Sequence, residues 1–241
     1  QGRFAPLCYL CGSGTLTPID YDLPVPSAQV KSAILLAGLR SEGRSRLGGF
    51  IGSRDHTERM LRLFKADLRT AGRAIRVCPG KPLVSPGRIV VPADISSASF
   101  FIVLGLLAGE SVLTIQQVSL NPTRAGIIRV LKRMGGDIRI TAHPGNRLPG
   151  HEPMGDITVR SSKLTATRIK KEEIPSLIDE LPILMVAASL ARGRSVFEAV
   201  QELRVKETDR IRSMHENLAR LGADIALHSR NSREDLVITG T

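Results

Sequence analysis

The hydrophobic positions of this chain predict the same succession of helices and strands three times. Long apolar segments predict one helix in each repeat, at residues 28–39, 96–107 and 178–190. A glycine-containing turn and a strand follow each of them. Apolar residues at three- and four-residue spacing then predict a second, amphipathic helix, at residues 56–64, 124–134 and 209–221. Two further strands complete each repeat, so the unit is β-α-β-α-β-β.

The three repeats cover residues 16–86, 87–162 and 164–240, and together they predict an α+β fold. Their first helices are apolar nearly all round, so we expect them to be buried within a domain. The pattern between residues 70 and 90 is less regular, and it leaves the strand boundaries there open.

Composition and charge narrow the class of protein. The chain has 241 residues, 42% of them hydrophobic, which is enough for one large domain or two ordinary ones with buried cores. A net charge of +11 at pH 7 favours anionic partners. The basic residues are spread out and aromatic residues are scarce, which weakens a nucleic-acid-binding interpretation.

The sequence also bears on location and metal binding. It has no apolar stretch of eighteen residues and no signal peptide at its start, and its odd number of cysteines indicates a reducing compartment. We therefore expect a cytoplasmic protein without a membrane span. Cys8 and Cys11 have the spacing of a metal knuckle, but only Cys78 could join them. Free thiols are the better interpretation, and no metal site is expected.

Polar residues at predicted helix starts are the first candidates for chemistry. Asp94 and Ser96 begin one of the apolar helices, where they either cap the helix or help to bind an anion. Asp179 enters the third apolar helix with hydrophobic residues on both sides. Such a carboxylate tends to have a raised pKa, so Asp179 is either a buried cap or a general base.

Residues 202–210 carry three cations and three anions at the start of another helix. Asp209 suits a helix N-terminus, where the helix dipole favours negative charge. Lys206 and Arg210 are four apart and would share one face of a helix. That face could hold an anionic substrate with carboxylates nearby. The alternative is a solvated, salt-bridged helix start, which the spacing alone favours.

Six segments in a fixed order resemble one known family. They are residues 26–39 (PSAQVKSAILLAGL), 54–61 (RDHTERML), 94–101 (DISSASFF), 121–126 (NPTRAG), 177–184 (LIDELPIL) and 202–210 (ELRVKETDR). Together they resemble the 5-enolpyruvylshikimate-3-phosphate synthases, or 3-phosphoshikimate 1-carboxyvinyltransferases. The resemblance implies two lobes of three β-α-β-α-β-β units each. Residues 1–86 would form the last unit of one lobe and residues 87–241 two units of the other.

The resemblance implies a reaction of the shikimate pathway, in aromatic amino acid and chorismate biosynthesis. The 5-hydroxyl of shikimate 3-phosphate adds to C2 of phosphoenolpyruvate while C3 is protonated, and phosphate then leaves. Both substrates are polyanions, which suits lysine and arginine ligands. This mechanism requires neither a metal nor an organic cofactor. Ser27, Ala28 and Gln29 match a loop that meets shikimate 3-phosphate, and Gln29 also reaches phosphoenolpyruvate. Arg54 matches a position near the shikimate phosphate.

The remaining implied residues belong to the transfer step. Asp179 matches the carboxylate that takes the proton from the attacking hydroxyl, and Lys206 matches the lysine that hydrogen-bonds this hydroxyl. Glu207 is implied as a partner in proton transfer to the methylene carbon, and Arg210 matches an arginine that clamps phosphoenolpyruvate. The resemblance implies mainly framework roles for Asp94, Ser96, Asn121 and Arg124.

The family enzymes are longer, so the chain resembles an internal segment without the N- and C-terminal parts. Gln1 in place of Met agrees with that expectation. We expect the segment alone to be inactive, and the full-length enzyme to be a monomer without nucleic-acid or membrane partners. Two alternatives remain: an enolpyruvyl transferase that acts on UDP-N-acetylglucosamine, and a non-enzymatic module that binds nucleic acid or another anion.

Overall fold

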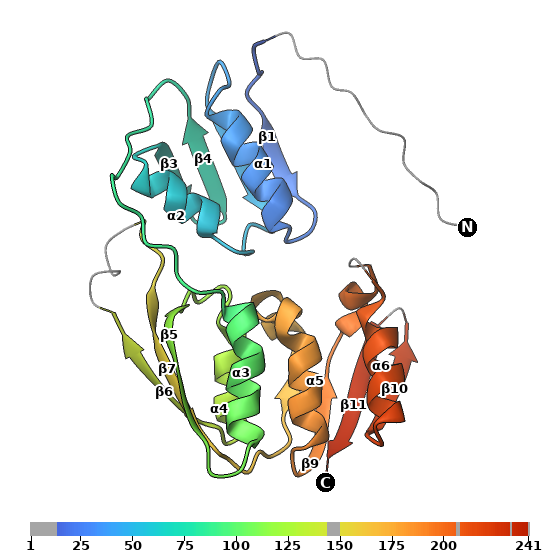
Figure 1. Ribbon diagram of the computed structural model, residues 1–241. Helices are drawn as coiled ribbons and strands as arrows, with labels where there is room; N and C mark the ends of the chain where they lie inside the picture. The colour runs from blue at the N-terminus through green and yellow to red at the C-terminus, as the bar shows by residue number, and fades with distance from the viewer. Residues whose placement is uncertain (1–13, 144–149, 206–207, 232, 241) are drawn as a thin grey trace. The chain divides into compact units, whose positions relative to one another are not determined.

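The computed structural model describes residues 14–143, 150–205, 208–231 and 233–240 (Figure 1). Its internal contacts divide the chain into two units, Gln1–Gly87 and Arg88–Thr241. That the first unit belongs to one lobe and the second to another stays a prediction.

The first unit contains one repeat. Its elements are β1 (Asp20–Leu23), α1 (Ala28–Gly38), β2 (Ser45–Gly49), α2 (His56–Leu63), β3 (Asp67–Ala71) and β4 (Ala74–Cys78). The sheet has the order β1-β2-β4-β3, with β1 and β2 parallel and the other neighbours antiparallel. A core of aliphatic side chains between the sheet and its helices includes Leu23, Leu35, Leu47, Ile75 and Val77.

The second unit contains the other two repeats. The first of these consists of α3 (Ile95–Leu107), β5 (Val112–Ser119), α4 (Gly126–Arg133), β6 (Asp137–Ala142) and β7 (Met154–Arg160). The next repeat begins with β8 (Arg168–Ile169), η2 (Lys171–Ser176), η3 (Ile178–Glu180), α5 (Leu181–Ser189) and β9 (Gly193–Phe197). It ends with η4 (Val200–Val205), α6 (Arg210–Arg220), β10 (Asp224–Arg230) and β11 (Arg233–Gly240).

The strand order confirms the predicted repeat. In the third sheet the order β8-β9-β11-β10 reproduces that of the first unit, with β8 and β9 parallel. The middle sheet has the order β5-β7-β6, and one parallel bridge from Ala93 to Val118 stands where the opening strand was expected. The predicted α+β fold of repeated units is therefore correct, although the opening strand shortens from the first repeat to the other two.

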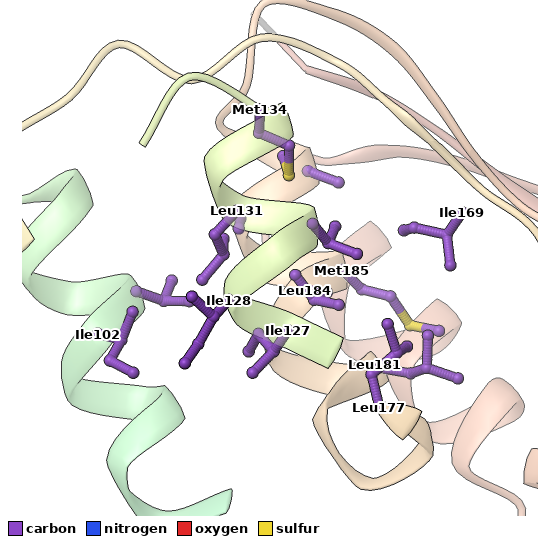
Figure 2. Packing of buried hydrophobic residues seen from close by; sticks show 14 of the residues in the cluster. Ile102, Ile127, Ile128, Leu131, Met134, Ile169, Leu177, Leu181, Leu184 and Met185 are labelled. Atoms are coloured by element: carbon purple, nitrogen blue, oxygen red, sulfur yellow. The ribbon is translucent and has the colours of Figure 1, made fainter. Parts of the chain in front are cut away.

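One continuous apolar core joins the two repeats of the second unit. Side chains of α3, α4 and α5 meet in it, among them Ile102, Ile128, Leu131 and Leu184 (Figure 2). Leu177 and Leu181 belong to the same cluster and anchor the chain just before and at the start of α5. The core therefore fixes the turn that carries Asp179.

The expectation that the first helices are buried is wrong for one side of α1 and of α3, whereas α5 has no exposed residue. Phe100, Phe101 and Leu104 of α3 are 57–59% exposed, and Leu36 of α1 is 53% exposed. Each of these two helices buries only the side that it turns toward its sheet and neighbouring helices, so an apolar opposite side stays exposed. Uniform hydrophobicity along a helix did not indicate how many of its sides are covered.

Candidate functional site

The turn between η3 and α5 places two carboxylates side by side in sequence with very different surroundings. Asp179 and Glu180 end η3, and α5 then starts at Leu181 with Pro182 in its first turn, where a missing N–H is tolerated. The side chain of Asp179 is 27% exposed, whereas that of Glu180 is fully buried. Asp179 is therefore accessible to a ligand and Glu180 is not.

Two arginines from different helices bind the Asp179 carboxylate. Arg124 Nη1 donates to Asp179 Oδ2 at 2.9 Å, and Arg210 Nη1 donates to Asp179 Oδ1 at 3.3 Å. Arg124 precedes α4 and Arg210 begins α6, so three segments that are distant in sequence meet at this carboxylate. Charge-assisted hydrogen bonds of this kind are stronger than neutral ones. Asp179 is thus not simply a helix cap.

Arg124 also binds groups behind Asp179. Its Nη2 donates to Ser96 Oγ at 2.5 Å and lies 3.5 Å from Glu180 Oε1 and 3.6 Å from Asp94 Oδ1. Ser96 Oγ in turn donates to Glu180 Oε1 at 2.5 Å. Burial is the main cause that raises the pKa of the Glu180 carboxyl, with Ser96 and Arg124 opposing it and Asp179 adding to it. The guanidinium of Arg124 therefore links an exposed and a buried carboxylate.

Asp94 is the N-cap of α3, which confirms one of the two interpretations of this residue. Its carboxylate accepts from the backbone N–H groups of Ser96 and Ser97 at 3.2 and 2.9 Å. These bonds, together with Arg124, lower the pKa of Asp94 even though partial burial, the largest single contribution, acts in the opposite direction. Ser96 is not the cap, and its hydroxyl turns to Glu180 and Arg124 instead.

Part of residues 202–210 lies outside the described residues, including Lys206 and Glu207. Residues before them form η4, and α6 starts at Arg210 with Asp209 as its N-cap, which accepts from Arg212 N at 3.0 Å. The prediction that Asp209 suits a helix N-terminus is correct. The expectation that Lys206 and Arg210 share one helix face involves Lys206 and therefore lies outside the described residues.

Arg204 connects the two sides of this segment. It donates to Asp209 Oδ2 at 2.7 Å and to both carboxylate oxygens of Glu234 on β11 at 2.6 and 2.8 Å. Its Glu234 partner is the main reason that the pKa of Arg204 is raised. A salt-bridged helix start was the alternative interpretation of residues 202–210, and salt bridges are indeed present there. They connect Arg204 with Asp209 and with β11, and they do not exclude a binding site in this segment.

The other candidate residues lie in the first unit. Ser27 caps α1 by accepting from Val30 N at 3.3 Å, and Ala28 and Gln29 follow in the first turn, with Gln29 exposed. Arg54 is half-buried in the loop before α2. Lys31 Nζ donates to the carbonyls of Ile51 and Ser53, both at 3.2 Å, and so ties this loop to α1.

The structure thus brings Asp179 and Arg210 together in the second unit, and the Ser27–Gln29 turn and the Arg54 loop onto neighbouring segments of the first. Sequence reasoning missed Glu180 as a member of the site and assigned mainly framework roles to Ser96 and Arg124. Ser96, Arg124 and Asp179 belong to three separate motifs, and each motif by itself looks like an ordinary helix start. Nothing in the spacing of residues 96, 124 and 179 shows that they meet.

Within the ranges that the structure covers, no group of three or more His, Cys, Asp or Glu side chains could hold a metal ion. Cys8 and Cys11 lie outside these ranges. Among the same residues, every helix is too short or too polar to cross a membrane.

The fold and this cluster define a class of enolpyruvyl transferases, and comparison with known proteins narrows the class. A family model described as EPSP synthase (3-phosphoshikimate 1-carboxyvinyltransferase) matches residues 2–238, so the chain belongs to the EPSP synthase family. A 3-phosphoshikimate 1-carboxyvinyltransferase of Petrotoga mobilis is 48% identical over 226 residues, covering 93% of this chain and 51% of the relative. One of Geobacter sp. strain M21 is 52% identical over 225 residues, with the same coverage.

Solved structures agree. An EPSP synthase from Acinetobacter baumannii matches with a TM-score of 0.82 and 41% identity, over 94% of this chain and 49% of that chain. The enolpyruvyl transferase NikO from Streptomyces tendae, at 18% identity and a TM-score of 0.68, shares the fold. The chain spans about half the length of the curated relatives it matches.

Proposed function

We propose that the full-length gene product transfers the enolpyruvyl group of phosphoenolpyruvate to the 5-hydroxyl of shikimate 3-phosphate and releases phosphate. Family membership supports this reaction, and the observation that carries it is the accessible Asp179 carboxylate between Arg124 and Arg210. A base for a hydroxyl group and a cation for an anionic substrate are thereby adjacent, as this reaction requires.

In this proposal Asp179 accepts the proton of the 5-hydroxyl as its oxygen bonds to C2 of phosphoenolpyruvate, while C3 gains a proton. C3 then loses a proton and the bond between C2 and the phosphate oxygen is cleaved. These two changes release phosphate and restore the double bond. Arg210, which lies 3.3 Å from Asp179, would turn its guanidinium to the phosphoenolpyruvate anion. Lys206 would hydrogen-bond the hydroxyl, and Glu207 would serve the proton transfer at C3.

The first unit would supply the shikimate 3-phosphate contacts. Ser27 caps α1 and Ala28 and Gln29 begin its first turn, where backbone N–H groups and the helix dipole favour an anion. Arg54 would bind the phosphate from the neighbouring loop, and Gln29 would also reach phosphoenolpyruvate. The two units would belong to different lobes, and the reaction would need no metal or organic cofactor. The full-length gene product would act as a cytoplasmic monomer.

The test measures phosphate release by the full-length gene product with each substrate alone and with both. Release is expected only when shikimate 3-phosphate and phosphoenolpyruvate are both present, and Asp179→Ala is expected to abolish it in a folded protein. Turnover with UDP-N-acetylglucosamine in place of shikimate 3-phosphate would favour the alternative enolpyruvyl transferase, which acts on that sugar nucleotide. Binding of an oligonucleotide that weakens steeply with salt, with indifference to shikimate 3-phosphate, would favour a non-enzymatic module.

A further inference from the structure

A buried polar network lies behind the carboxylate that the proposed reaction uses as its base. Arg124, Ser96 and Glu180 form it, and each of the three comes from a different segment of the second unit. None of them is needed to contact a substrate. Their arrangement nevertheless constrains where the Asp179 carboxylate can point.

The backbone that carries Arg124 is fixed first. Asn121 is fully buried, and its Oδ1 accepts from the N–H and the hydroxyl of Thr123 at 2.9 and 2.7 Å. Asn121 Nδ2 donates to Glu152 Oε2 at 2.9 Å, and the Asn121 carbonyl accepts from Arg124 N at 2.8 Å. Residues 121–124 therefore form a turn with little freedom before α4.

The guanidinium of Arg124 is fixed next. Its side chain is 10% exposed, Nη2 is held by Ser96 Oγ, and Nη1 remains for Asp179. The direction of these bonds is set: Arg124 donates to Ser96, and Ser96 donates to Glu180. A planar guanidinium with one edge so held presents its other N–H in one direction only.

The buried Glu180 carboxyl gives a physical reason for the Arg124 guanidinium beside it. It is 1% exposed, and its Oε2 has no hydrogen-bond partner among the described residues. Ser96 and Arg124 both face its other oxygen. A buried carboxylate requires hydrogen bonds or a counter-charge, so Glu180 holds the guanidinium from behind while Asp179 meets it from the accessible side.

We propose that Arg124 is a positioning residue of the enolpyruvyl transfer, which aims the Asp179 carboxylate at the attacking hydroxyl. This inference rests on the function proposed above. Arg210 also binds Asp179. In the proposed mechanism, however, its guanidinium turns toward phosphoenolpyruvate when that substrate binds. With substrate bound, Arg124 therefore still holds the Asp179 carboxylate in place.

The test compares three variants of the full-length gene product by steady-state kinetics across pH. Arg124→Met removes the charge, and Arg124→Lys keeps the charge but not the forked geometry. Arg133→Met is the matched control, because Arg133 also pairs with a carboxylate of the second unit. Its partners are Glu173, at 2.8 Å, Thr167 and the Arg168 carbonyl.

Arg124→Met is expected to lower kcat by about 10²-fold, as for a reacting group displaced by roughly an ångström, with much smaller changes in both KM values. The acidic limb of its pH profile moves to higher pH, since a carboxylate that loses a neighbouring cation keeps its proton to higher pH. Asp94, Glu180 and Arg210 also face this centre and are unchanged in the variant. Arg124→Lys restores the acidic limb and part of kcat, and Arg133→Met leaves both as in the wild type.

A folded Arg124→Met protein with the kcat and pH profile of the wild type would overturn this inference and leave the proposed function standing. An equal loss in Arg133→Met would also overturn it, since the effect would then be structural. If Arg124→Met does not fold, Arg124→Lys and Ser96→Ala decide, and unchanged kinetics in both contradict the role. A wild-type protein without turnover on the two substrates refutes the proposed function, and the role of Arg124 in that reaction with it.

Discussion

Lys31→Met is expected to destabilise the first unit far more than the loss of an ordinary surface ion pair. Lys31 is fully buried on α1, and its Nζ lies 2.6 Å from Glu58 Oε1, whose side chain is 5% exposed. The same Nζ donates to two carbonyls of the loop before α2. Removing the ammonium group leaves a buried carboxylate without its cation, and Glu58 Oε2 already has no partner among the described residues.

The magnitude follows from burial rather than distance. Breaking a buried ion pair by removing one partner costs about 3–5 kcal/mol, because the remaining charge is uncompensated. Replacing both partners, as in Lys31→Met with Glu58→Leu, is expected to cost much less than Lys31→Met alone. Arg46→Met is the matched control: Arg46 lies 2.6 Å from Asp20 in the same unit, but the two side chains are 37% and 72% exposed. An exposed ion pair of this kind contributes little to stability, because water screens it.

The assay is amide hydrogen exchange, which reports the stability of each unit separately in the full-length gene product. For Lys31→Met, the slowest amides of α1 and β4 are expected to exchange roughly 10²- to 4 × 10³-fold faster, at about 1.4 kcal/mol per factor of ten. Amides of α3 and α5 serve as the internal reference. The reasoning fails if Lys31→Met and Arg46→Met have equal effects, or if the double variant is no more stable than Lys31→Met.

Three further changes test the second unit. Asp209→Ala removes the N-cap of α6 and should destabilise that helix by about 1 kcal/mol, seen as faster exchange of its amides; Asp209→Asn, which keeps a capping oxygen, should lose less. Gly126→Ala would place a Cβ 2.8 Å from the Ser176 carbonyl oxygen and should lower the free energy of unfolding, measured in urea, by about 1–3 kcal/mol. Gly109→Ala is the control and should be near neutral, because a Cβ at Gly109 would have nothing within 4 Å. Equal effects of the two variants would contradict the steric argument. Burial raises the pKa of Glu180 above 4.5, so its ionisation opposes folding as pH rises through the folded value. The stability of Glu180→Gln relative to the wild type should therefore increase from below pH 4.5 to neutral pH, and a difference that stays constant with pH would refute this.

Local patterns predicted the elements well because helices and strands depend on residues close in sequence. The amphipathic segment at residues 209–221 corresponds to α6, and the aspartate before it caps that helix. Motif resemblance gave the family and Asp179. Neither kind of signal reports which side of an apolar helix is covered, and the exposed side of α3, with Phe100 and Phe101, was not predicted. Coverage depends on packing between elements, which periodicity does not encode.

The sequence by itself determined the repeated β-α-β-α-β-β unit, the family, and the carboxylate at the start of α5. Only the tertiary structure decided what surrounds that carboxylate. Arg124 lies 55 residues before Asp179 and Arg210 lies 31 residues after it, yet both guanidinium groups reach its oxygens. Glu180 follows Asp179 directly, but the fold buries one side chain and exposes the other. Charge and burial at a site arise from contacts between distant segments, so the network behind Asp179 became visible only once those segments were folded together.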